Sequence, residues 1–152
     1  MAGSRWATKR GRRGGSIGTF DAGRVRDTIA FVAGEIAALC AGQTADITAV
    51  HDVSGGGLAT ALAEMVAVSG LGVTIDELAG RGEFFAEFPG RFIVGTADVE
   101  ALCARAAAAN VPCTVLGRVG GDQLVIGQQV AVSTATVARQ RRNALEDQLN
   151  AN

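Results

Sequence analysis

Apolar residues recur every three or four positions along much of the chain, which predicts amphipathic helices. The first predicted helix spans residues 20–41, with Asp21 as its N-cap and Gly42 as its end. Its apolar stripe consists of Val25, Ile29, Val32, Ile36 and Leu39. The same spacing predicts further helices over 58–69, 98–109 and 134–149. In the 98–109 helix Asp98 is the expected N-cap, and Asn110 is expected to end it.

Short runs of β-branched and apolar residues between these helices predict strands. They lie at 47–50, 73–75, 91–96, 111–119, 123–126 and 129–132. Pro89-Gly90 predicts a turn, residues 80–83 a loop, and Gly120-Gly121-Asp122 a hairpin turn. Helices that alternate with short strands favour an α/β (α+β) two-layer sandwich, in which a mixed sheet carries its helices mainly on one face.

Residues 1–19 differ from the rest of the chain, because basic residues and glycines replace the apolar pattern. We expect a disordered basic tail here, with an RNA-binding arm as the alternative interpretation. Residues 20–152 then form one domain.

Composition excludes several classes of function. A formal net charge of −1 gives no global basic field for nucleic acid, and no apolar run is long enough to span a membrane. The three cysteines show no CxxC spacing, so neither a metal site nor a disulfide framework is predicted. Cys40 and Cys103 fall on apolar helix faces and are expected to be buried thiols. We expect a reducing, cytoplasmic location.

A polar, glycine-rich turn follows the 47–50 strand and precedes the 58–69 helix. The free backbone N–H groups of Gly55, Gly56 and Gly57 could bind a phosphate or another anion at the start of the helix. Asp52 and Ser54 could cap the helix, ligate a cation or hydrogen-bond a ligand. A purely structural turn is the alternative. The turn matches neither GxxxxGK[ST] nor GxGxxG.

Two further positions allow both a structural and a functional interpretation. His51 is the only histidine, and it is either a weak catalytic candidate or a structural residue of the turn. Glu87 and Arg91 lie four residues apart around Pro89-Gly90. They could form an ion pair, or Arg91 could bind a ligand phosphate.

Three motifs in register resemble the C-terminal region of phosphoribosylformylglycinamidine synthase, the large synthetase of purine biosynthesis. They cover roughly residues 22–148 and read His51-Asp52-Val53-Ser54-x-Gly56-Gly57-Leu58, Phe85-x-Glu87-x-x-Gly90-Arg91, and Val111-Pro112 followed by Leu116-Gly117-x-Val119-Gly120-Gly121-Asp122. The resemblance implies a PurM-like C-terminal domain that is incomplete at its N-terminal side. The family usually has Asp or Glu where this chain has Gly55.

The resemblance also implies a reaction. In the family, ATP activates the amide oxygen of formylglycinamide ribonucleotide, and glutamine-derived ammonia displaces the phosphate to give the amidine. ATP and Mg²⁺ are the family's cofactors, and its nucleotide-binding and glutaminase residues lie outside the motifs found here. The implied partners are the remaining synthetase domains or a second subunit, a phosphate-bearing ribonucleotide substrate, or a second copy of the chain. The isolated chain is expected to be inactive.

Two alternatives stay open at this point. The chain could be a non-catalytic interaction module or gene remnant that docks on a partner. It could also be a small nucleotide-binding protein that resembles hydrogenase-maturation proteins or selenophosphate synthetase, which share the wider superfamily.

Overall fold

The computed structural model describes residues 21–44, 46–75 and 84–150, without the side chains of residues 145–148 and 150. The expected tail over 1–19 and the loop over 80–83 lie outside the described residues. The chain divides into two compact units. The first comprises the described residues of Met1–Ala61 and Gly82–Val115, and the second those of Leu62–Arg81 and Leu116–Asn152.

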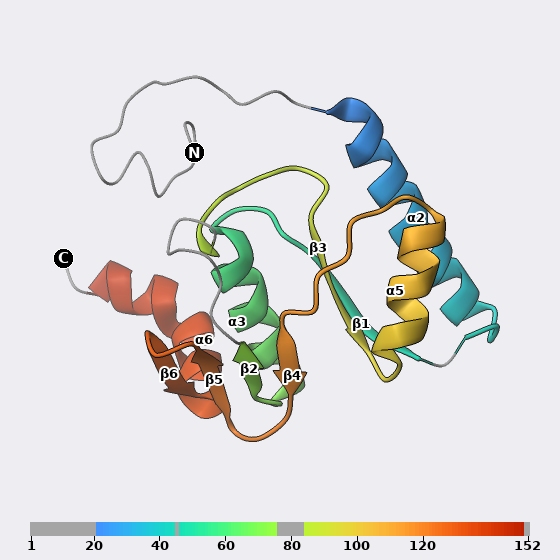
Figure 1. Cartoon of the computed structure of the whole chain (residues 1–152). Helices are drawn as coiled ribbons and strands as arrows, with labels where there is room; N and C mark the ends of the chain where they lie inside the picture. Colours follow the sequence, from blue (N-terminus) through green and yellow to red (C-terminus); the bar gives the residue numbers. More distant parts are fainter. Residues whose placement is uncertain (1–20, 45, 76–83, 151–152) are drawn as a thin grey trace. The chain divides into compact units, whose positions relative to one another are not determined.

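The first unit is built on a two-stranded antiparallel ribbon. Strands β1 (Ile47–Asp52) and β3 (Phe92–Thr96) form this ribbon. Helices α2 (Ala22–Cys40) and α5 (Val99–Ala108) lie side by side along it (Figure 1). Helix α3 (Gly57–Ser69) begins in this unit, shortly after β1.

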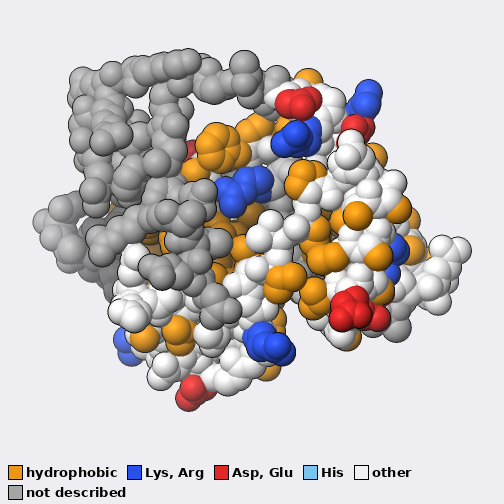
Figure 2. All heavy atoms as spheres, in the orientation of Figure 1, with side chains coloured by type: hydrophobic (Ala, Val, Ile, Leu, Met, Phe, Trp, Pro, Cys, Tyr) orange, Lys and Arg blue, Asp and Glu red, His pale blue; other side chains and the backbone are white. Residues whose placement is uncertain are grey.

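Helix α2 has the predicted ends. The side chain of Asp21 accepts a hydrogen bond from the Arg24 amide at 3.0 Å, and the Gly42 amide closes the last turn on Leu39 at 3.0 Å. The predicted stripe is only partly covered, however. Val32 is 6% exposed, whereas Ile29 and Ile36 are 49% and 40% exposed. Figure 2 shows that hydrophobic side chains reach the surface of the molecule.

Helix α5 is capped by Asp98 as predicted, and its end redirects the chain. The Asp98 carboxylate accepts from the Ala101 amide at 2.9 Å. Asn110 adopts φ 55°, and the Val111 amide folds back to the Ala106 carbonyl at 2.8 Å. Because that amide closes the helix and Pro112 has none, the predicted strand over 111–119 is wrong in its first part. Only Gly117–Val119 forms a strand, β4.

The second unit contains a four-stranded mixed sheet in the order β4-β2-β5-β6. Strand β2 (Val73–Ile75) is antiparallel to β4 and parallel to β5 (Gln123–Ile126), while β6 (Val130–Ser133) pairs antiparallel with β5. The hairpin predicted across Gly120-Gly121-Asp122 is therefore wrong, because β2 lies between the two strands that this turn connects.

Gly72 explains this arrangement, since it sits where the 120–122 segment crosses the start of β2. Its amide donates to the Gly121 carbonyl at 2.9 Å, and its carbonyl accepts from the Gly120 amide at 2.8 Å. A Cβ on Gly72 would lie 2.5 Å from the Gln123 carbonyl oxygen. Only glycine permits so close an approach of two backbone segments.

Helix α6 (Thr134–Asn150) follows β6, and its Arg141 forms an ion pair with Glu64 of α3. Helices combined with a mixed sheet and an antiparallel ribbon confirm the predicted α/β (α+β) fold class. In the described ranges, no helix combines the length and the apolar character that a membrane span requires.

Candidate functional site

The pairing of β1 with β3 brings the first two sequence motifs together. Asp52 at the end of β1 is paired with Phe92 at the start of β3, and the Val53 amide donates to the Arg91 carbonyl at 2.8 Å. In an antiparallel ribbon, the segment that leaves one strand lies beside the segment that enters the other. The strand is also longer than the predicted 47–50, because His51 and Asp52 belong to it and not to the turn.

A shallow cavity of about 310 Å³ opens at this end of the ribbon. Residues 52–55 and 87–92 line it, so Asp52, Ser54, Gly55 and Arg91 of the predicted site share one cavity. The Asp52 side chain is 63% exposed. Among the residues that the structure describes, no carboxylate forms an ion pair with the Arg91 guanidinium.

The amides of the glycine-rich turn already have acceptors within the protein at two of three positions. The Gly56 amide donates to Glu87 Oε1 at 2.9 Å, and the Gly57 amide donates to the Ser54 carbonyl at 3.0 Å. Within the described part of the chain, the Gly55 amide has no acceptor. The suggested Glu87–Arg91 ion pair is wrong, because the Glu87 carboxylate turns to the start of α3 instead.

Gly57 fixes the packing of the turn. It adopts φ +70°, and a Cβ at this position would lie 2.6 Å from the Phe84 carbonyl oxygen and 2.8 Å from Phe85 Cα. The backbone therefore passes directly against residues 84–85 before α3 begins. No hydrogen bond joins the side chain of Asp52 or Ser54 to the first turn of α3 in the described ranges, so Ser54 supports the helix through its carbonyl.

His51 lies in β1 beside this cavity but does not line it. Its Nδ1 is 2.6 Å from the Asp52 carbonyl oxygen and 3.8 Å from Asp52 Oδ1, and the side chain is 26% exposed. This backbone contact holds the imidazole against its own strand.

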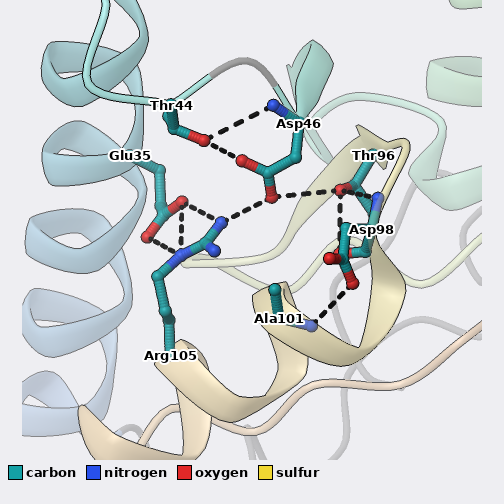
Figure 3. Close-up of polar contacts among 7 residues, drawn as sticks. All are labelled: Glu35, Thr44, Asp46, Thr96, Asp98, Ala101 and Arg105. Carbon is teal, nitrogen blue, oxygen red and sulfur yellow. Dashed lines mark hydrogen bonds and ion pairs between the residues drawn. The ribbon is translucent and has the colours of Figure 1, made fainter.

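A second polar cluster, which sequence reasoning missed, joins α2 and α5 to the segment that enters β1 (Figure 3). Arg105 of α5 donates from Nε to Glu35 Oε1 of α2 at 2.9 Å, and a terminal nitrogen lies 2.8 Å from Glu35 Oε2 and 2.8 Å from Asp46 Oδ2. Asp46 precedes β1 and also accepts from Thr44 and Thr96. We call Glu35, Asp46 and Arg105 the carboxylate–arginine cluster.

Charge pairing shifts the titration of this cluster. The hydrogen bond from Arg105 holds the pKa of Asp46 below its usual range, although burial opposes the shift. Glu35 and Asp46 together raise the pKa of Arg105, again against burial. The side chains of Glu35 and Asp46 are only 12% and 15% exposed. One signal was visible in the sequence: Glu35 falls next to Ile36 of the apolar stripe of α2.

The cysteines differ from the expectation of buried thiols. Cys40 is the last residue of α2 and is exposed, so the helix turns its thiol toward solvent. Cys103 is half-buried, and its Sγ lies 3.2 Å from Sγ of the exposed Cys113. All three cysteines are free, and the described residues contain no group of three metal-ligating side chains.

Comparison with known proteins confirms the resemblance that the motifs indicated. The chain is 41% identical over 128 residues to the phosphoribosylformylglycinamidine synthase subunit PurL of Rhizobium meliloti, an alignment that covers 81% of this chain and 16% of the relative. It is 47% identical over 92 residues to the PurL subunit of Sinorhizobium medicae, in an alignment that covers 57% of this chain and 12% of the relative. It is 34% identical over 123 residues to the PurL subunit of Zymomonas mobilis, in an alignment that covers 78% of this chain and 16% of the relative.

The chain thus spans about 12% to 16% of the length of these relatives. The family model for the C-terminal domain of AIR synthase related proteins matches residues 25–128, which include both motifs at the cavity. The match extends over more than half of the 152 residues. The chain therefore belongs to the family of AIR synthase related protein C-terminal domains.

Proposed function

We propose that this chain acts as the PurM-like C-terminal part of an ATP-dependent synthetase that converts formylglycinamide ribonucleotide and ammonia to the amidine. On its own it is inactive. Within the assembly, the cavity at residues 52–55 and 87–92 contacts a phosphate group of the ribonucleotide or of ATP. The relatives, which are phosphoribosylformylglycinamidine synthase subunits, support the first part of this proposal.

The observation that carries the phosphate contact is the position of Arg91. Arg91 lines the cavity, and no carboxylate forms an ion pair with it among the described residues. Gly55 lines the same cavity, and its amide has no acceptor among those residues. A guanidinium and a backbone N–H are both donors suited to phosphate oxygens. Glu87 lines the same cavity, and its negative charge opposes anion binding.

The donor set fits a phosphate better than a metal ion. Among the residues that the structure describes, the acidic side chains that line the cavity are Asp52 and Glu87, and there is no cluster of three metal-ligating groups. The proposal therefore assigns phosphate contact to Arg91 and Gly55. It leaves Mg²⁺ and the reacting groups to other parts of the assembly.

Calorimetry with inorganic phosphate and with ATP–magnesium tests the phosphate contact on the full chain. We expect weak binding that Arg91→Gln reduces severalfold. Glu87→Gln should tighten binding by about twofold to fivefold, because it removes a negative charge from the cavity. Arg118→Gln is the matched control, since it removes an exposed positive charge from β4 in the second unit. An equal loss of binding affinity in the Arg91 and Arg118 variants would contradict a phosphate site at this cavity.

A complementation assay tests the synthetase assignment. The chain is mixed with a synthetase that lacks this region, and ammonia-dependent amidine formation is measured. Restored activity supports the assignment. Absence of rescue by a chain that circular dichroism shows to be folded contradicts it and favours the interaction module. Tight ATP binding by the isolated chain, with no rescue, favours the independent nucleotide-binding protein.

A further inference from the structure

The end of α5 brings two cysteines together that lie ten residues apart in the sequence. Asn110 and Val111 close the helix and reverse the chain. The Asn110 amide donates to the Ala107 carbonyl at 3.0 Å, and the Val111 amide donates to the Ala106 carbonyl at 2.8 Å. The reversal directs residues 111–113 back along α5. As a result, Cys113 Sγ lies 3.2 Å from Cys103 Sγ, and both thiols are free.

We propose that Cys103 and Cys113 form a modification site, in which a small-molecule disulfide such as oxidised glutathione converts the two thiols into an intramolecular disulfide. Neither the sequence motifs nor the phosphate cavity involves these residues. The site would hence operate whatever reaction the intact assembly performs.

The exchange proceeds in two balanced steps. The sulfur of exposed Cys113, as its thiolate, attacks one sulfur of the small disulfide, which gives a mixed disulfide and releases one thiolate of the reagent. Cys103, having lost its proton, then attacks Cys113 Sγ and releases the second reagent thiolate. Two cysteine thiols are oxidised, and one disulfide of the reagent is reduced to two thiols.

The surroundings of the pair set the conditions for this chemistry. Partial burial, followed by the contact with Cys103, raises the pKa of the Cys113 thiol to about 11. Little thiolate is present at neutral pH, so exchange with a small disulfide is slow there. Mildly alkaline solution gives enough thiolate to observe the exchange.

The disulfide would join α5 to the segment through which the chain leaves the first unit, which ends at Val115. This covalent link would constrain the reversal, which the backbone hydrogen bonds of Asn110 and Val111 now help to hold. A disulfide across a short loop restricts the unfolded chain. The oxidised protein should therefore show a higher urea midpoint than the reduced protein.

Peptide mapping tests the proposal directly, because Arg105 lies between the two cysteines. The full chain is incubated with oxidised glutathione, the remaining thiols are alkylated, and the denatured protein is digested with trypsin. We expect residues 92–105 and 106–118 as one cross-linked product, with the loss of two of the three thiols and full reversal by a reductant.

Cysteine variants provide the controls. Cys40→Ser should retain the cross-link, whereas Cys103→Ser and Cys113→Ser should each abolish it. Separate glutathione adducts on Cys103 and Cys113 in the wild-type chain would overturn the proposal, as would a cross-link that involves Cys40. The wild-type peptide map decides the question even if a variant fails to fold.

Discussion

Glu87 accepts a hydrogen bond at 2.9 Å from the backbone amide of Gly56, the residue immediately before α3. A carboxylate from a distant segment thus occupies the position at which the sequence suggested that an external anion could bind. Negative charge at the start of a helix is favourable, because the first amides carry partial positive charge. The contact also ties the turn before β3 to the turn after β1.

Replacing Glu87 by alanine should destabilise the protein by about 1 kcal/mol. The substitution removes a charge-assisted hydrogen bond that is only part-buried, and it leaves the Gly56 amide to water. The measurement is the urea midpoint at constant m-value. Glu100→Ala serves as the control, since Glu100 is exposed in the first turn of α5. Equal midpoints for the two variants would show that the contact contributes nothing specific.

The two glycines that flank Gly56 should tolerate a methyl group very differently. Gly57→Ala should cost about 1–3 kcal/mol, because a Cβ there would lie 2.6 Å from the Phe84 carbonyl oxygen and the backbone has φ +70°. Gly55→Ala should change stability by less than about 0.5 kcal/mol, since nothing lies within 4 Å of a Cβ there. The free energies of unfolding of both variants are measured in urea. A loss of stability in Gly55→Ala as large as that in Gly57→Ala would contradict this account of the turn.

Local signals predicted much of this fold. Asp21 and Asp98 cap their helices as expected, and the strand over 73–75 has the predicted bounds. These features depend on side chains close in sequence, so a single chain reveals them. By contrast, Asp52, Ser54, Gly55 and Arg91 line one cavity because β1 pairs with β3, and no local signal indicates that pairing.

The errors arise where distant segments decide the structure. Nothing near Gly120 indicates that β2 will separate β4 from β5, because the cause is the backbone approach at Gly72. Similarly, Glu87 and Arg91 have a spacing that suits an ion pair, yet the Gly56 amide provides a competing donor from the other strand end. The position of Glu35 beside the apolar stripe of α2 does not indicate its distant partners in the carboxylate–arginine cluster, Arg105 and Asp46.

The carboxylate–arginine cluster should make Arg105 far more sensitive than a typical surface arginine. Arg105→Ala leaves two largely buried carboxylates without their cation. We expect the free energy of unfolding to fall several times further than in Arg118→Ala, whose effect should stay within about 0.5 kcal/mol. The stability of Arg105→Lys should lie between those of the wild type and Arg105→Ala, because an ammonium keeps the charge but cannot reproduce the simultaneous contacts with Glu35 and Asp46. Unfolding midpoints that do not follow this order would contradict the bridging role of Arg105.

Asp46 should make the stability of the protein sensitive to acid. Its pKa in the folded protein lies below the ordinary value of 3.8, chiefly because Arg105 donates a hydrogen bond to its carboxylate. The unfolded chain therefore binds this proton first as the pH falls. The stabilising contribution is complete above 3.8 and is lost as the pH falls through 3.8 toward the lower folded value.

Asp46→Asn removes this titration, so its free energy of unfolding should decline less steeply than that of the wild type between neutral pH and about pH 3. Urea unfolding across this range provides the slopes. Asp122→Asn is the matched control, because Asp122 is exposed and has no ion pair in the described part of the chain. A wild-type slope in Asp46→Asn would mean that the pairing of Asp46 with Arg105 does not govern the acid response.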